Sequence, residues 1–339
     1  MHRCLQLAAL GAGYVAPNPM VGAVLVHQNR IIGEGYHKQF GAAHAEVNCL
    51  QNVADNDREL IADSTLYVSL EPCAHYGKTP PCADLIISHN IKTVVVGCRD
   101  PFEKVDGKGI EKLQNAGITV IVGVLEADCV QLNKRFFCFH QEKRPYIILK
   151  WAESVNHCIA GEHKEQVSIS GPITNRLVHR WRTEEAAIAV GTATALLDNP
   201  ALTARLWPGH QPLRVVLDKQ LVVPEGHQLF SEAAPTLVFN QLKSGKAGDI
   251  NYIKLNNQEN LVTQLLQNLY ALQVQSVLIE GGTKFIQSFI QAKAWDEARV
   301  ITNTEMVIAA GYAAPVLDSG RIFQSEQLGT DLIQYFNPA

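Results

Sequence analysis

Apolar and polar positions follow two different periodicities along the first half of the chain. Short apolar runs, typical of buried strands, are separated by segments whose apolar residues recur at helical spacing. Strands are expected at 21–26, 30–37, 65–70, 93–98 and 118–125. Helices are expected at 42–53, 80–90, 108–116 and, as one continuous segment, 126–142. This alternation predicts a mixed sheet with helices on both faces.

The same alternation continues after a polar segment at 140–145. Strands are expected at 146–151, 186–191, 213–218, 236–240 and 276–282. Helices are expected at 172–183, 260–272 and 283–291. We therefore predict an α/β protein with two domains, 1–143 and 144–339.

Length and composition fit two globular domains. The 339 residues exceed one typical domain, and a content of 47% hydrophobic and 18% charged residues can build two cores. The net charge of −4 lacks the basic surplus of a general nucleic-acid binder. No apolar run reaches the ~18 to 20 residues that span a bilayer. Eight scattered cysteines and a start without the apolar core of a signal peptide favour a cytoplasmic protein.

The first stretch with candidate chemistry is HAEVNCL, at 44–50. Alone, it fits an ordinary helix start, because such residues fall together by chance in many helices. Downstream, EPCAHYGKTPPC places Cys73 after a strand and Cys82 in the first turn of a helix. His44, Cys73 and Cys82 would supply the three protein ligands of a catalytic zinc, whose fourth position holds water. The helix starts at His44 and Cys82 favour an anionic ligand.

Glu46 follows His44 by two residues and fits the role of a proton carrier. Zinc lowers the pKa of its bound water toward ~7, and a nearby carboxylate can carry the proton to a departing amine. The pattern H-x-E with P-C…C matches the signature of zinc nucleobase deaminases, although the longer segment AHYGKTPP separates the thiols here. The remaining cysteines are interpreted as core or structural residues: Cys4, Cys49, Cys98, Cys129, Cys138 and Cys158.

These motifs, with APNPMVGAVLV and VVVGCRDPFEKVDGKGI, resemble the deaminase domain of the bifunctional riboflavin-biosynthesis deaminase/reductase family. The resemblance implies deamination of 2,5-diamino-6-ribosylamino-4(3H)-pyrimidinone 5′-phosphate, with zinc on the three ligands above and Glu46 as proton shuttle. It also implies that Asn18 binds the pyrimidine and that His75 and Lys78 line the substrate pocket. A solvated loop position is the alternative for His75 and Lys78.

The second half resembles the reductase domain of that family, which is related in fold to dihydrofolate reductase. The matching segments are 181–205, LRVVLD and IEGG. The resemblance implies NADPH-dependent reduction of the ribosyl group to ribityl. It places the substrate at Arg182, Leu202, Arg205 and Glu280. It places NADPH at Ser168, Thr194, Asp198, Gly281 and Gly282. By residue chemistry alone, the two arginines could instead form exposed ion pairs, and the glycines a plain turn.

The chain departs from the family pattern on the cofactor side. In KWAESVNHCIA, Asn156 replaces the usual acid and His157 the usual glycine, and Ser168 replaces a tryptophan. We expect a working reductase that is weakened or retuned by these changes. One rival hypothesis is a deaminase with an inactive reductase-like domain, and another is a nucleotide-binding module with a structural zinc. We expect a homo-oligomer that acts on a small phosphorylated pyrimidine, with neither nucleic acid nor membrane as partner.

Overall fold

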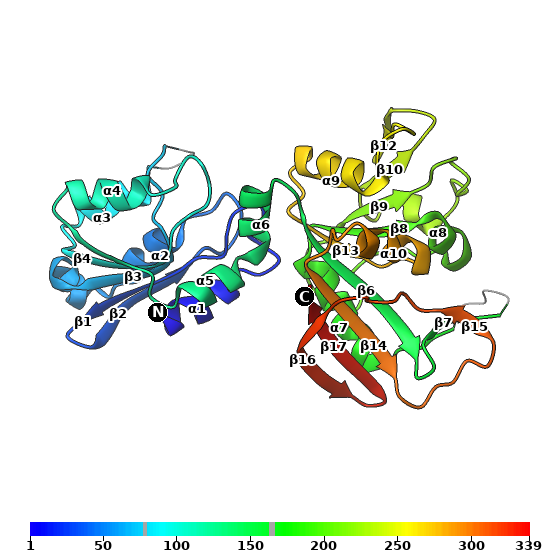
Figure 1. Ribbon diagram of the computed structural model, residues 1–339. Helices are drawn as coiled ribbons and strands as arrows, with labels where there is room; N and C mark the ends of the chain where they lie inside the picture. Colours follow the sequence, from blue (N-terminus) through cyan, green and yellow to red (C-terminus); the bar gives the residue numbers. More distant parts are fainter. Residues whose placement is uncertain (77–79, 163–166) are drawn as a thin grey trace. The chain divides into compact units, whose positions relative to one another are not determined.

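The computed structural model describes residues 1–76, 80–162 and 167–339, and the chain divides into two compact units, Met1–Lys143 and Arg144–Ala339 (Figure 1). Each unit has its own sheet and its own hydrophobic core. Within the described ranges, no helix has the length and apolar character needed to cross a membrane.

The first unit is built on a five-stranded sheet in the order β2-β1-β3-β4-β5. The strands are β1 (Gly22–His27), β2 (Arg30–Tyr36), β3 (Thr65–Leu70), β4 (Thr93–Cys98) and β5 (Thr119–Val122). β1 pairs antiparallel with β2 and β3, whereas β3, β4 and β5 run parallel. The carboxyl ends of β3 and β4 therefore lie at the same edge of the sheet, where ligands of such sheets commonly bind.

Helices cover both faces of this sheet, as the hydrophobic pattern predicts (Figure 1). They are α1 (His2–Ala9), α2 (Ala45–Gln51), α3 (Cys82–Ser88), α4 (Lys108–Asn115), α5 (Glu126–Leu132) and α6 (Lys134–Glu142), with a 3₁₀ helix at Asp55–Asp63. On one face Leu66 and Val68 pack with α2, α3 and α4. On the other, Val24 and Tyr67 pack with α1. Leu70, the last residue of β3, packs with residues of α5 and α6. Successive strand residues serve opposite faces because strand side chains alternate.

The prediction of one continuous helix over 126–142 is wrong. The helix breaks at Asn133, where φ is −103° and ψ is 23°. The carboxamide of Asn133 accepts a hydrogen bond from Met20 N (2.8 Å) and donates one to Met20 O (2.9 Å). This pairing satisfies both backbone groups of Met20, a half-buried loop residue.

The second unit holds a ten-stranded sheet in the order β11-β12-β10-β9-β8-β13-β6-β14-β17-β16. Its strands are β6 (Tyr146–Ser154), β8 (Ala187–Gly191), β9 (Leu213–Leu217), β10 (Thr236–Asn240), β11 (Gly245–Ala247), β12 (Ile250–Lys254), β13 (Ser276–Ile279), β14 (Glu297–Asn303), β16 (Arg321–Leu328) and β17 (Asp331–Asn337). β7 (Cys158–Gly161) and β15 (Gly311–Ala313) form a separate pair. From β12 to β14 the neighbouring strands are parallel.

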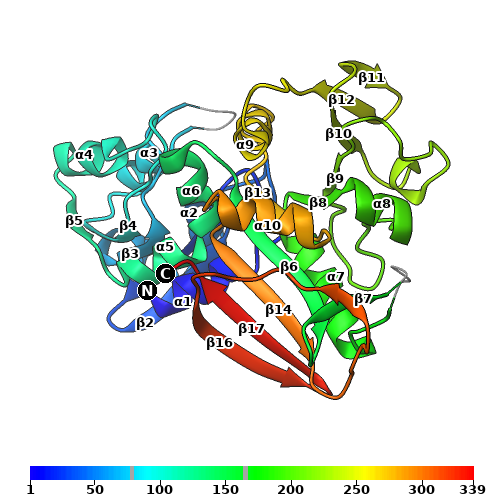
Figure 2. The same cartoon turned by 45° about the vertical axis from the view of Figure 1, so that its right-hand side comes forward.

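Among its described residues, the second unit has the helices α7 (Pro172–Glu184), α8 (Thr192–Asp198), α9 (Leu261–Ala271) and α10 (Thr283–Gln291), with a 3₁₀ turn at Gln228–Phe230. α9 and α10 cover one face, and their residues pack with alternate residues of the parallel strands (Figure 2). The intervening strand residues pack on the opposite face with Ala195 of α8, Leu202 and Leu229.

The predicted strands and helices between 146 and 291 are present. The elements β7, α8, β11 and β12 were not predicted, nor was any element after 291. The three strands β14, β17 and β16 add an antiparallel edge to the sheet. β16 is mostly exposed and lacks the apolar alternation of a half-buried strand. Pairing with β17 holds this strand in the sheet. The order of apolar and polar residues within β16 does not indicate that pairing.

Candidate zinc centre and reductase site

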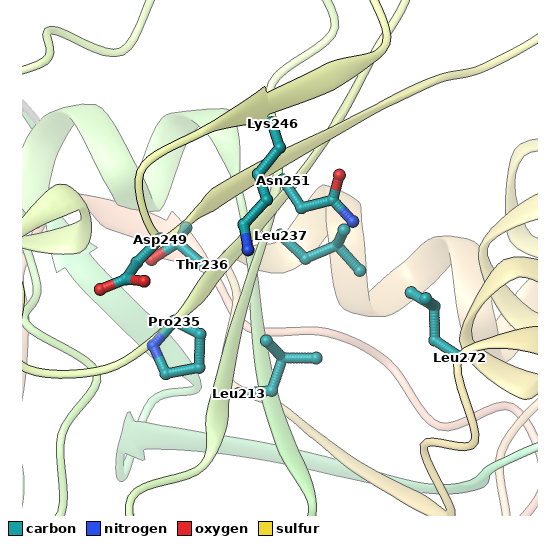
Figure 3. Close-up of a pocket in the computed structure, with 8 residues that line it drawn as sticks. All are labelled: Leu213, Pro235, Thr236, Leu237, Lys246, Asp249, Asn251 and Leu272. Carbon is teal, nitrogen blue, oxygen red and sulfur yellow. The ribbon is translucent and has the colours of Figure 1, made fainter.

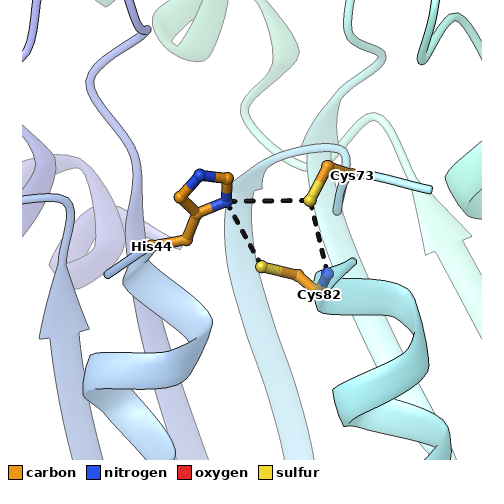
Figure 4. A group of neighbouring side chains, drawn as sticks. All are labelled: His44, Cys73 and Cys82. Carbon is orange, nitrogen blue, oxygen red and sulfur yellow. Dashed lines mark hydrogen bonds between the residues drawn. The ribbon is translucent and has the colours of Figure 1, made fainter. Parts of the chain in front are cut away.

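Three side chains from separate segments meet at the edge of the first sheet (Figure 4). His44 is the residue that caps α2, Cys73 follows β3, and Cys82 is the first residue of α3. Nδ1 of His44 lies 3.7 Å from Sγ of Cys73 and 3.4 Å from Sγ of Cys82. Helix starts at His44 and Cys82 are thus as predicted from the sequence.

These distances fit one tetrahedral zinc ion. Zn–N bonds of about 2.0–2.1 Å and Zn–S bonds of about 2.3 Å, at tetrahedral angles, separate N and S by about 3.6 Å. The ligand atoms of His44, Cys73 and Cys82 all lie within 4.8 Å of one another. A hydrogen bond with Cys82, with a further contribution from His44, lowers the pKa of Cys73 to about 4. A thiolate at Cys73 is the form that binds metal.

Glu46 lies in the first turn of α2, directly beside these three groups. Its side chain is buried, with 3% of the residue exposed. Burial raises the pKa of Glu46 to about 7, and the negative charge of Cys73 adds to the effect. A carboxyl group that titrates near neutral pH can both take up and release a proton under working conditions.

Asn18 is held by His37, a residue that the sequence interpretation missed. Nδ2 of Asn18 lies 3.1 Å from Nε2 of His37, and Nδ1 of His37 lies 3.0 Å from the carbonyl oxygen of Ala43. Because Ala43 O can only accept, His37 carries its proton on Nδ1, and Nε2 accepts from the Asn18 amide. The His37 ring also contacts His44 edge to face at 5.4 Å. His37 thereby fixes which way the Asn18 carboxamide points.

His75 lies in the segment between the two thiols, and its ring centroid is 6.0 Å from that of Phe102. Nδ1 of His75 is buried, and no hydrogen-bond partner for it is found among the described residues. The predicted role of His75 in the substrate pocket stays a prediction. Lys78 lies outside the described residues.

In the second unit, a buried group of charges forms at the carboxyl ends of the strands. The guanidinium of Arg182 on α7 donates to both carboxylate oxygens of Glu280, at 2.9 and 2.8 Å. Nζ of Lys150 on β6 lies 3.6 Å from Glu280 Oε2. Lys150 was not among the predicted site residues, although it is the first residue of the family segment KWAESVNHCIA and lies inside a predicted buried strand. One carboxylate and two cations leave this site with excess positive charge.

Arg205, the fourth predicted substrate residue, is exposed on the loop that follows Leu202. Two contacts with α7 anchor that loop: Arg182 Nη1 donates to Thr203 O (3.1 Å), and Leu206 N donates to Nδ1 of His179 (3.4 Å). Burial, with the charges of Arg182 and Arg205, lowers the pKa of His179 to about 4. Neutral His179 therefore remains an acceptor for this loop at physiological pH.

Leu202 itself packs in the hydrophobic cluster under β8, β9 and β10 and has a φ of 51°. Its predicted contact with substrate stays a prediction.

Of the residues predicted to bind NADPH, the structure brings Thr194 and Gly282 into contact. Gly282, the cap residue of α10, donates its N–H to Oγ1 of Thr194 at 2.9 Å. Asp198 is half-buried at the end of α8, and Ser168 is exposed.

The two replaced residues after β6 have hydrogen-bond partners of their own. Oδ1 of Asn156 accepts from Ser154 Oγ (2.7 Å) and Ile308 N (3.1 Å). His157 adopts a φ of 56°, a left-handed conformation that favours glycine, and its Nδ1 lies 2.7 Å from Oε1 of Glu153. Both side chains are therefore held by specific contacts in this turn.

A separate pocket lies at the amino ends of β9, β10 and β12 (Figure 3). Its lining includes Leu213, Leu237, Lys246 and Asn251. None of the predicted site residues lies in it, and it is at the opposite end of the strands from Glu280. The charged group of Glu280, Arg182 and Lys150 lies instead at the carboxyl ends of the strands.

Comparison with known proteins gives both units relatives. The family model of the cytidine and deoxycytidylate deaminase zinc-binding region matches residues 1–98, and that of the RibD C-terminal domain matches 145–312. The riboflavin biosynthesis protein RibD of Aquifex aeolicus (strain VF5) is 37% identical over 99% of this chain and 97% of its own length. The chain belongs to the RibD family. RibD of Escherichia coli (strain K12) is 34% identical over 88% of this chain and 84% of its own length.

Solved structures of RibD proteins share the whole architecture. The diaminohydroxyphosphoribosylaminopyrimidine deaminase/5-amino-6-(5-phosphoribosylamino)uracil reductase of Thermotoga maritima has a TM-score of 0.91 at 36% identity, covering 100% of this chain and 97% of that chain. Acinetobacter baumannii RibD, form 1, has a TM-score of 0.90 at 30% identity, with the same coverage. The expected two-domain α/β fold and the family resemblance are thus confirmed.

Proposed function

We propose that this chain catalyses two consecutive steps of riboflavin biosynthesis: zinc-dependent deamination of a phosphorylated diaminopyrimidine, followed by NADPH-dependent reduction of its ribosyl group. The deaminase is assigned to residues 1–143 and the reductase to 144–339. The observation that carries the proposal is the meeting of His44, Cys73 and Cys82 with buried Glu46 in a RibD-family chain.

In the deaminase, His44, Cys73 and Cys82 would hold a zinc ion, which when bound would supply an activated water. Glu46 would take up a proton at its carboxylate and release it to the departing amine, and its burial keeps both protonation states accessible near neutral pH. Asn18, oriented by His37, forms hydrogen bonds with the polar edge of the pyrimidine. This orientation is set before substrate arrives, which reduces the entropic cost of binding.

In the reductase, Arg182, Lys150 and Arg205 provide the positive charge that a sugar phosphate requires. Glu280 holds Arg182 and Lys150 in place and offsets part of their charge. Gly281 and Gly282 lie at the start of α10, whose positive end favours the phosphates of NADPH, and the hydrogen bond from Gly282 N to Thr194 Oγ1 holds this turn. The hydride comes from the cofactor, and the protein binds and orients both reactants.

The rival hypothesis of an inactive reductase-like domain draws on Asn156, His157 and Ser168. The first two are accommodated by specific hydrogen bonds, and the charged group at Glu280 is complete. We therefore propose an active reductase. The structural-zinc hypothesis is disfavoured because three protein ligands leave a coordination position open, whereas a structural site normally has four.

A coupled assay tests both activities. The diaminopyrimidine phosphate is supplied with and without NADPH, and with and without a zinc chelator. We expect deamination that stops on chelation, and NADPH oxidation that needs the deaminated product. Deamination without NADPH oxidation, in a protein whose second unit is folded, would exclude the bifunctional assignment in favour of a deaminase alone.

The state of assembly proposed here is a homo-oligomer. Support comes from β16, whose outer edge ends the ten-stranded sheet and whose Ile322 and Phe323 are 47% and 44% exposed. Exposed apolar side chains on an edge strand favour association with another chain. Light scattering after gel filtration tests this, and a monomeric mass at micromolar concentration would contradict it.

A further inference from the structure

Glu71 precedes Cys73 by two residues and makes a set of contacts that neither proposed activity uses. Its residue is 4% exposed. Its carboxylate accepts four backbone N–H groups from the segment after β4. Oε2 accepts from Asp100 N (3.2 Å) and Gly107 N (3.0 Å). Oε1 accepts from Gly109 N (2.9 Å) and Ile110 N (3.2 Å).

Two of these donors belong to the first turn of α4. The cap residue of that helix, Gly107, has no side chain and provides no cap of its own. The first N–H groups of a helix lack partners within the helix, so Glu71, which directly follows β3, acts as their cap from outside the helix. A carboxylate also interacts favourably with the positive end of the helix.

The start of α4 also packs directly on the peptide that leads to Cys73. A Cβ atom added to Gly109 would lie 1.9 Å from the carbonyl oxygen of Pro72. That distance is far below any real contact, so only glycine permits this approach. The first turn of α4 therefore packs closely against Pro72, and the same turn donates hydrogen bonds to Glu71.

Cys73 is held from its other side by α3. Ala83 N donates to Cys73 O at 3.1 Å, and Cys82 N donates to Cys73 Sγ at 3.3 Å. Lys112 of α4 and Asp84 of α3 form an ion pair at 2.5 Å, which ties the two helices together. The start of each helix is thus directed at the Glu71–Cys73 segment, one from each side.

We propose that Glu71 is a positioning residue of the zinc centre: it fixes α4 against Pro72 and so keeps Sγ of Cys73 at binding distance from His44 and Cys82. This rests on the proposed zinc site. The same carboxylate orders the loop that carries Phe102, since Phe102 N donates to Asp100 Oδ1 (2.8 Å) and its ring contacts His75. Glu71 therefore influences both a metal ligand and the predicted substrate pocket.

The test uses the full chain and the Glu71→Gln variant. The amide can still accept from Gly109 and Ile110, but its NH2 group faces the N–H groups of Asp100 and Gly107. We expect zinc affinity, measured by competition with a chromophoric chelator, to fall about 10-fold or more, which is the range seen when groups around a metal site are altered. The absorption spectrum of the cobalt(II)-loaded protein should change in its ligand-field bands, because Cys73 Sγ is displaced.

Two further variants make the result decisive. Gly109→Ala should weaken metal binding in the same direction, although alanine favours helix formation. Glu111→Gln, an exposed position of the same helix, should leave zinc affinity and the cobalt spectrum unchanged. The reductase activity of all variants should equal that of the parent chain. If Glu71→Gln does not fold, Gly109→Ala alone decides the question.

The outcomes separate the two proposals. If the parent chain binds neither zinc nor cobalt through thiolates, the zinc centre itself is wrong. If the parent binds both and Glu71→Gln and Gly109→Ala match it in affinity and spectrum, the zinc centre stands and the positioning role of Glu71 is overturned.

Discussion

Arg182 and Glu280, 98 residues apart in the chain, form a two-pronged ion pair in which Nε and Nη2 lie 2.9 and 2.8 Å from the carboxylate oxygens. Both side chains are largely buried, at 13% and 10% exposed. Lys150 approaches the same carboxylate, so a single anion holds two cations. The sequence resemblance assigned Arg182 and Glu280 to the substrate separately, whereas the structure shows that each positions the other.

Glu280→Gln should abolish most reductase activity and destabilise the second unit. The substitution leaves Arg182 and Lys150 buried without their anion, and breaking a buried pair in this way costs about 3–5 kcal/mol. All four tryptophans of the chain lie beyond residue 144, so tryptophan fluorescence in urea reports on this unit. Glu184→Gln, which removes a partner of exposed Arg180, serves as control. NADPH oxidation at the parent rate in Glu280→Gln would refute this role.

Acid should weaken the second unit through the same carboxylate. Burial alone would raise the pKa of Glu280, but Arg182 and Lys150 outweigh it and lower the pKa to about 2. An unfolded glutamate titrates near ~4.3, so the stabilisation is complete above that pH and is lost as the pH falls toward about 2. The free energy of unfolding, followed by tryptophan fluorescence from pH 6 to 3, should therefore decline more steeply in the parent than in Glu280→Gln. Parallel curves would contradict the prediction.

Glu46→Gln should retain zinc and lose deamination. The amide keeps the size of the side chain but cannot carry a proton, and a positioned acid–base group typically contributes about 10²- to 10⁴-fold to rate. Metal content by atomic absorption and the deamination rate are measured together, with exposed Glu59→Gln as control. A zinc-loaded Glu46→Gln that deaminates normally would remove Glu46 from the mechanism.

Asn18→Ala should raise the KM for deamination about 10-fold, because an unmade hydrogen bond to a buried polar group costs about 1–3 kcal/mol. His37→Ala should act in the same direction, since His37 Nε2 orients the Asn18 amide. Zinc content should be unchanged in both variants. Asn52→Ala, at an exposed position of the same unit, provides the control. An effect of His37→Ala that adds fully to that of Asn18→Ala would show that the two residues act independently.

His157→Gly should be more stable than His157→Ala by about 1 kcal/mol. Both variants lose the contact with Glu153 Oε1, but only alanine keeps a Cβ at a φ of 56°, and left-handed backbone costs a non-glycine residue about 1–2 kcal/mol. Urea unfolding monitored by tryptophan fluorescence measures the difference. Trp151 donates to the other oxygen of Glu153 at 2.7 Å, so its emission is sensitive to this site. Equal stability of the two variants would show that His157 is not strained.

Features that depend on nearby residues were predictable. The hairpin β1–β2, the strand β3 and the helix starts at His44 and Cys82 each follow from apolar spacing or from residues within one turn. The break at Asn133 was not predictable, because Met20, the residue with which the Asn133 side chain pairs there, lies 113 residues away in the chain. The exposed edge strand β16 was not predicted for a similar reason. Pairing with β17 holds it in the sheet, and its own sequence lacks the apolar alternation of a strand.

The sequence by itself determined which chemical groups are available: an imidazole, two thiols and a carboxylate in a recognisable order, and the family to which that order belongs. Only the tertiary structure decided how these groups are held. His37 orients Asn18, Glu71 caps α4 beside Cys73, and Glu280 joins Arg182 to Lys150. Each contact satisfies a polar group removed from water, and its partner can lie anywhere in the chain. Spacing along the sequence reports such a contact only when the partners are neighbours.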